Sequence, residues 1–257
     1  MNLVINGALG YMGREVISLC KQGYHGAHLA FGVDRDATGC DNIYPSFSFA
    51  PPLTDVDCIV DFSHHTAVGD LLDFAVSHAI PTVIATTGHT DAERALIRST
   101  ARHIPIFLSA NMALGVALLV ELARWCALAL PDAEIEIIEK HHSRKADAPS
   151  GTALMIADAI RDVRTDACVK IGRSGIARRT PHEIGIHAVR MGALVGAHEV
   201  MIATQNQTIT LKHEAHSRTL FAEGAIAAAE FITTCENGLY DMKSLVSGER
   251  ERVEQGI

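Results

Sequence analysis

The chain has 257 residues, of which 48% are hydrophobic, so it can bury the core of one large α/β domain or of two smaller domains. Only 5% of the residues are aromatic, which favours helices packed on a parallel sheet over a β-sandwich. The formal net charge of −8 argues against nucleic acid and anionic lipid as partners, and no apolar run has the length of a membrane span. The amino-terminal segment reads directly as a strand, so we expect no signal peptide and a cytoplasmic location.

The first third of the chain alternates short apolar runs with segments of helical periodicity. This alternation implies right-handed βαβ units and a parallel sheet. We expect strands at 3–6, 28–33, 58–61, 81–85 and 104–108, and helices at 12–22, 66–78 and 91–103.

The pattern changes in the second half, where a long apolar helix is followed by strands of alternating polarity. This part reads as an α+β domain with a mixed or antiparallel sheet, in which Thr204–Asn206 forms a hairpin. We expect helices at 114–130, 152–163 and 221–235, and strands at 134–139, 183–189, 199–203 and 207–212.

Three glycines, Gly7, Gly10 and Gly13, lie between the first strand and the first helix. Glycines at this junction allow a tight turn and a close approach to a pyrophosphate at the helix N-terminus, although they also occur in turns that bind nothing. Asp34 ends the second strand, where a carboxylate can bind ribose hydroxyls, and the guanidinium of Arg35 can hold a 2′-phosphate. The pair therefore suggests use of both NADH and NADPH, against the alternative of a solvated turn.

A polar loop follows the strand at 134–139 and ends where a helix begins. His141 and His142 have the residue type for proton transfer near neutral pH, and Lys145 adds a positive charge. The run Ser150–Thr152 offers hydroxyls and helix N-terminal N–H groups to an anion such as a carboxylate. Three alternatives stay open: an ordinary surface loop, a histidine pair that ligates a metal, and Ser150 as a helix cap alone.

The run from Glu139 to Ala153 resembles the E-x-H-H-x-x-K-x-D-A-P-S-G-T-A stretch of the dihydrodipicolinate reductase family. The glycine loop is similar to that family's G-x-x-G-x-M-G motif, so the resemblance extends over almost the whole chain. Further similar runs are Asp61-Phe62-Ser63, Thr86-Thr87-Gly88, Ser109-Ala110-Asn111, Arg190-Met191-Gly192 with Gly196, His198 and Glu199, and Gly238-Leu239-Tyr240-Asp241-Met242.

The resemblance implies an α/β fold with a Rossmann-like parallel-sheet dinucleotide-binding domain at 1–112. An α+β domain for substrate binding and oligomerisation is inserted at 113–218, and the chain returns to the first domain at 219–257. It further implies a cytoplasmic homotetramer without a metal. This enzyme would use NADH or NADPH to reduce a cyclic imine-type dicarboxylate to tetrahydrodipicolinate, in lysine and diaminopimelate biosynthesis.

The resemblance also implies residue roles. His141 corresponds to the proton donor and Lys145 to its catalytic partner. Tyr11, Ala85, Met112 and Met191 depart from the family pattern, which has Arg, Gly, an aromatic and a small residue there. The implied substrate contacts are His142, Lys145, Ser150, Gly151 and Thr152, and the implied cofactor contacts are Gly7, Gly10, Tyr11, Met12, Gly13, Asp34, Arg35, Thr86, Thr87, Gly88, Asn111 and Met112.

Two other functions are compatible with a glycine loop of this kind. A homoserine- or semialdehyde-type dehydrogenase would share the Rossmann scaffold, but the semialdehyde enzymes need a nucleophilic cysteine, and none of the six cysteines has such a context. A non-catalytic nucleotide sensor would keep the glycines but would have no need of His141 and Lys145.

Overall fold

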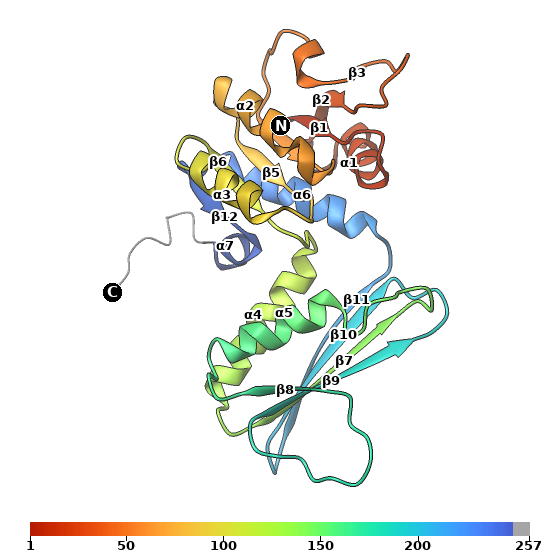
Figure 1. Ribbon diagram of the computed structural model, residues 1–257, viewed down its shortest axis with the longest axis vertical. Helices are drawn as coiled ribbons and strands as arrows, with labels where there is room; N and C mark the ends of the chain where they lie inside the picture. Colours follow the sequence, from red (N-terminus) through yellow and green to blue (C-terminus); the bar gives the residue numbers. More distant parts are fainter. Residues whose placement is uncertain (249–257) are drawn as a thin grey trace. The chain divides into compact units, whose positions relative to one another are not determined.

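The computed structural model describes residues 1–248 and separates into two compact units (Figure 1). Unit 1 contains Met1–Leu114 together with the chain from Thr219 onward, and unit 2 contains Gly115–Arg218. The chain therefore leaves unit 1 once and returns to it. Residues 249–257 of the expected return segment lie outside the described residues.

Unit 1 contains a seven-stranded sheet in which every pairing is parallel. Its strand order is β12-β6-β5-β4-β1-β2-β3, so the chain winds outward from β1 in one direction and from β4 in the other. Ligands of such sheets bind where the direction reverses, beyond the carboxyl ends of the strands. The strands are β1 (Asn2–Asn6), β2 (His28–Val33), β3 (Ile43–Tyr44), β4 (Cys58–Asp61), β5 (Thr82–Ile84), β6 (Pro105–Leu108) and β12 (Gly238–Tyr240).

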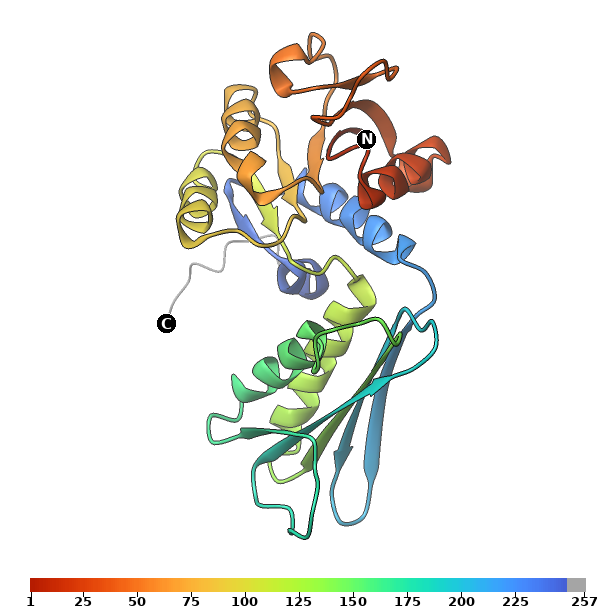
Figure 2. The same cartoon turned by 45° about the vertical axis from the view of Figure 1, so that its right-hand side comes forward.

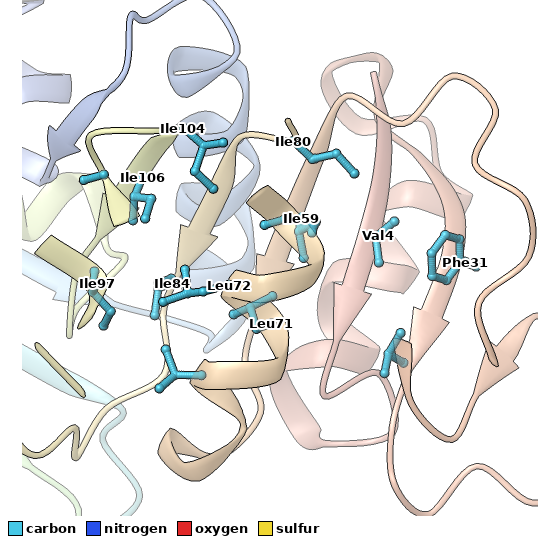
Figure 3. Close-up of a cluster of buried hydrophobic side chains, with 14 residues drawn as sticks. Val4, Phe31, Ile59, Leu71, Leu72, Ile80, Ile84, Ile97, Ile104 and Ile106 are labelled. Atoms are coloured by element: carbon cyan, nitrogen blue, oxygen red, sulfur yellow. The ribbon is translucent and has the colours of Figure 1, made fainter. Parts of the chain in front are cut away.

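The strands of this sheet are continuous apolar runs because helices cover both of its faces. Side chains such as Val4 and Ile59 pack with Leu71 and Ile97 in the core shown in Figure 3. The alternate residues Leu3 and Ile5 are also fully buried, on the opposite face. The helices of unit 1 are α1 (Tyr11–Lys21), α2 (Val68–Ser77), α3 (Asp91–Thr100), α6 (Thr219–Ile232) and α7 (Met242–Ser247).

Unit 2 contains a mixed five-stranded sheet with the order β11-β10-β7-β9-β8. Strand β10 is antiparallel to both of its neighbours, whereas β7, β9 and β8 run parallel. Helices α4 and α5 lie along one face of the sheet (Figures 1 and 2). The elements are α4 (Leu114–Ala129), β7 (Glu134–His141), α5 (Gly151–Arg161), β8 (Cys168–Ile171), β9 (Glu183–Arg190), β10 (Gly196–Ala203) and β11 (Thr208–Ala215).

The predicted fold class is confirmed: a Rossmann-like parallel sheet in one unit and a mixed α+β arrangement in the other. The predicted hairpin at Thr204–Asn206 is also confirmed, because it joins the antiparallel strands β10 and β11. The sequence did not predict β3, β8, β12 and α7, which are too short or too exposed to produce a clear apolar period. No helix within residues 1–248 is long and apolar enough to span a membrane.

A close backbone contact in unit 1 gives a stability prediction. Helix α6 contacts the chain at Met112 so closely that a Cβ on Gly224 would lie 1.7 Å from the Met112 carbonyl oxygen. We expect Gly224→Ala to lower the free energy of unfolding by about 2 kcal/mol, the usual cost of forced overpacking. The control is Gly69→Ala in α2, where a Cβ would meet nothing within 4 Å and should not destabilise the protein. Equal unfolding free energies for the two variants in urea titrations would contradict this packing.

Candidate active site

The glycine loop of unit 1 has the tight geometry that its sequence predicted. Gly7 has a φ of +78°, and a Cβ there would lie 2.6 Å from the Phe62 carbonyl oxygen at the end of β4. A Cβ on Gly13 would lie 2.1 Å from the Gly7 carbonyl oxygen, so the start of α1 lies directly against the loop. Gly10 is the N-cap of α1, and Tyr11 and Met12 form its first turn. The N-terminus of a helix is a place where backbone N–H groups can bind an anion.

Asp34 connects the loop to the end of β2. Its Oδ2 accepts the Leu9 N–H at 2.9 Å and its Oδ1 accepts the Asp36 N–H at 3.1 Å, so the carboxylate is held in one orientation. The Arg35 side chain is 87% exposed, and its Nε lies 3.8 Å from Asp36. A cavity of about 870 Å³ runs past these residues and the glycine loop to Phe47. Its glycine cradle and its acidic residue fit a dinucleotide.

Buried polar side chains join the neighbouring strand ends of unit 1. Asp61, at the end of β4, accepts hydrogen bonds from the Asn6 amide at 2.8 Å and from the Ser63 hydroxyl at 2.5 Å. Burial raises the pKa of Asp61, and these hydrogen bonds oppose the increase. Asp61 and Ser63 belong to the run Asp61-Phe62-Ser63, for which the sequence alone predicts no role. The structure shows that they connect the ends of β1 and β4.

The remaining expected cofactor contacts follow β5 and β6. Thr86 is buried, while Thr87 and Gly88 are exposed and Gly88 has a φ of +85°. Asn111 accepts the Ala113 N–H at 3.0 Å through its side chain. Met112 is only 2% exposed, so its side chain lies in the core of unit 1.

In unit 2, the sheet register brings four polar residues together. The β7–β9 register pairs His141 with Arg190, and the β7–β10 register pairs Glu139 with His198. Glu139 is fully buried, and its Oε2 lies 2.6 Å from His141 Nδ1. Arg190 donates to both oxygens of this carboxylate, at 2.7 and 2.6 Å. Burial raises the pKa of Glu139, but the hydrogen bonds from Arg190 and His141 outweigh that effect and the net shift is downward.

Ser150 is the N-cap of α5 and is engaged within the protein through both of its polar groups. Its N–H donates to Glu139 Oε1 at 3.0 Å. Its hydroxyl accepts the Ala153 N–H at 3.2 Å and lies 3.0 Å from His198 Nε2. Ser150 therefore caps α5, and Gly151 and Thr152 form the first turn of the helix beyond it.

The loop after β7 gathers positive charge. Lys145 Nζ lies 2.8 Å from Asp147, and its side chain is 22% exposed. Burial lowers the pKa of His142, and the charges of Arg144 and Arg218 lower it further. Arg218 was not among the expected site residues, because it lies 76 positions beyond His142 in the sequence. In residues 1–248, no three His, Cys, Asp or Glu side chains are grouped closely enough to hold a metal ion.

Comparison with known proteins identifies the family. The chain matches the model of the dihydrodipicolinate reductase N-terminus over residues 1–112 and that of its C-terminus over residues 115–246. It is 43% identical to the 4-hydroxy-tetrahydrodipicolinate reductase of Caldanaerobacter subterraneus over 249 residues, 96% of this chain and 98% of the relative. The enzyme of the same name from Clostridium tetani is 38% identical over 251 residues, 96% and 97% of the two chains.

Solved structures agree in fold. The dipicolinate-bound dihydrodipicolinate reductase of Paenisporosarcina sp. TG-14 aligns with a TM-score of 0.80 at 22% identity, over 94% of this chain and 97% of that one. The amine dehydrogenase of Mycobacterium smegmatis aligns with a TM-score of 0.64 at 12% identity, over 95% of each chain, so other oxidoreductases share the scaffold. The extended sequence matches, rather than the shared scaffold, confirm the predicted family and reductase class: the chain belongs to the dihydrodipicolinate reductase family.

Proposed function

We propose that this oxidoreductase reduces the cyclic dicarboxylate substrate of its family with His141 as the proton donor and the loop after β7 as the carboxylate site. The observation that supports this most strongly is the contact between His141 and the buried, ionised Glu139. The reduced nicotinamide, when bound, supplies the hydride for an unsaturated carbon of the substrate ring. The protein must then supply one proton and must hold the ring in place.

His141 is suited to the proton transfer by its hydrogen bonds. An ionised carboxylate only accepts, so the 2.6 Å contact requires the proton on His141 Nδ1. The other ring nitrogen, Nε2, then carries the proton that is exchanged with a ligand. The His141 side chain is 11% exposed, which limits proton exchange between the ring and water.

Binding of the substrate carboxylates is proposed for Lys145, His142 and the first turn of α5. Lys145 and the N–H groups of Gly151 and Thr152 offer a positive charge and a helix N-terminus to an anion. Since the N–H and the hydroxyl of Ser150 are already engaged, we assign Ser150 to shaping the site rather than to direct binding. The dipicolinate in the related structure from Paenisporosarcina is a dicarboxylate of the expected class.

The dinucleotide is proposed to bind along the cavity of unit 1, against Gly7, Gly10 and Gly13, with Asp34 on the adenosine ribose. Arg35 has an exposed guanidinium that can meet a 2′-phosphate, so we propose that both NADH and NADPH are used. Asp34 keeps the ribose interaction of NADH because its carboxylate is held by two backbone N–H groups.

We also propose that the chain forms a homotetramer through surfaces that include α4. Its residues Leu118, Leu122, Trp125 and Leu128 are 44 to 70% exposed and recur at helical spacing. An apolar stripe of this kind on a monomer marks a protein interface, and a second copy of the chain is the partner that the family resemblance suggests.

Replacing His141 tests the proposed function most directly. We expect His141→Gln to lower kcat about 10²- to 10⁴-fold, because glutamine cannot transfer a proton, while KM moves less. Thr152→Val should instead raise KM, because a substrate contact made before the reaction is lost. Steady-state kinetics separate the two effects. A near-normal kcat for His141→Gln would show that the proton comes from elsewhere.

The cofactor proposal predicts a selective effect at Arg35. Arg35→Ala should weaken NADPH binding roughly 10-fold, equivalent to about 1.4 kcal/mol, and should leave NADH binding nearly unchanged. Fluorescence titration with both nucleotides measures this, with Arg98→Ala on the exposed side of α3 as the control. Equal losses for the two nucleotides at Arg35 would mean that this residue does not contact the 2′-phosphate.

The assembly proposal predicts a tetrameric mass by light scattering at micromolar concentration. Leu122→Glu places a charge within the exposed apolar stripe of α4 and should shift the population toward smaller species without unfolding unit 2. A monomeric mass for the unmodified chain contradicts the proposal.

A further inference from the structure

Glu139 carries a negative charge in a buried position, where loss of hydration makes a charge unfavourable. Its side chain is fully buried, and both carboxylate oxygens are used by His141, Arg190 and the Ser150 N–H. A buried ion pair contributes little net stability compared with apolar residues of the same volume. Arg190 alone would neutralise the charge of Glu139. The additional contact with the His141 imidazole at 2.6 Å therefore needs a separate explanation.

The contact with Glu139 fixes both the tautomer and the orientation of His141. The proton must lie on Nδ1, and a flipped ring would lose this hydrogen bond. Nε2 lies on the side of Gly196, where an added Cβ would come within 3.0 Å of it. Glycine at 196 therefore leaves room beside the nitrogen that must exchange a proton.

The charged groups near His141 favour reversible protonation of its ring. Glu139 on β7 and His198 on β10 lie against the ring of His141, Arg190 on β9 binds Glu139, and the charge of Lys145 in the following loop acts on His198. Arg190 balances Glu139 while His141 is neutral, and Glu139 offers the opposite charge when His141 is protonated. Burial lowers the pKa of His198 to about 4, and the His141 charge lowers it too, so His198 stays neutral and does not compete for the proton.

We infer that Glu139 is a positioning residue for the reaction: held by Arg190, it keeps one proton on His141 Nδ1, so that Nε2 is the nitrogen that gains a second proton and releases it to the substrate. The inference rests on the proposed role of His141 as proton donor. It assigns a function to a residue that does not itself touch substrate or cofactor. Arg190 acts one step further away, by keeping the Glu139 carboxylate ionised and in place.

The test is a double-mutant cycle with an NMR readout on the full chain. Glu139→Gln keeps the side-chain volume and removes the charge. We expect kcat to fall roughly 10- to 100-fold. Since the imidazolium loses its anionic partner, the decline of kcat with rising pH should begin at a lower pH than in the unmodified protein. Nitrogen chemical shifts of His141 should change from a single Nδ1–H tautomer to a mixture.

Because Glu139 is inferred to act through His141, Glu139→Gln should lower kcat no further when it is added to His141→Gln. The matched control is Glu136→Gln on the same strand, which removes a carboxylate that also binds an arginine and a histidine, Arg179 and His187. It should leave kcat, its pH profile and the His141 tautomer unchanged. If Glu139→Gln alone does not fold, Glu139→Gln with Arg190→Met removes both charges of the pair and should give the same kinetic and NMR changes.

A single Nδ1–H tautomer and an unchanged pH profile in Glu139→Gln would overturn the inference, as would a further loss of kcat in the His141→Gln background. A different result would remove the proposed function instead. If His141→Gln alone retained normal kcat while Glu139→Gln still changed the His141 tautomer, the positioning contact would stand but His141 would not be the proton donor.

Discussion

The register of β7 against its two neighbours is the constraint on which the site in unit 2 depends. Alternation along β7 places Glu139 and His141 on the face that α4 and α5 cover, and the neighbouring strands supply Arg190 and His198 beside them. A slip of one residue would turn Glu139 and His141 to the opposite face and separate them from these partners. Register is strongly specified here because the same slip would expose Ile135 and Ile137.

Unit 1 depends on a different constraint, the close packing of backbone around the glycine loop. Gly7 and Gly13 leave no room for side chains, so the start of α1 and the ends of β1 and β4 come within direct contact. Asp34 and Asp61 then connect the loop to the neighbouring strand ends through hydrogen bonds. Each unit therefore holds its polar groups on rigid elements, as a precise site requires.

The sequence predicted the elements with strong periodicity well, including β2 and β4 with the bounds that the structure has. It missed β3, β8 and β12, because these short strands are only partly buried and lack the continuous apolar run that marks the equally short β4. The motif of the His-His loop identified the family, but it could not show how its members are connected. Arg190 contacts Glu139, and His198 contacts Ser150, although the members of each pair lie about 50 positions apart in the sequence. Strand pairing brings them together, and sequence spacing does not contain that information.

The engagement of Ser150 shows the same limit in a single residue. The resemblance predicts that Ser150 binds a substrate carboxylate, and the structure adds that its N–H and hydroxyl contact Glu139, His198 and Ala153. Its role is thus tied to the orientation of α5 and of Glu139.

A crystal structure of the chain with bound cofactor and dipicolinate would test the central claim most directly. The account predicts one ligand carboxylate at Lys145 and the first turn of α5, with His141 Nε2 about 3 Å from an atom of the ligand ring or its nearest polar group. It also predicts that His141 Nδ1 keeps its hydrogen bond to the Glu139 carboxylate. A ligand bound with His141 Nε2 covered by protein, or with the ring turned away from Glu139, would contradict the account.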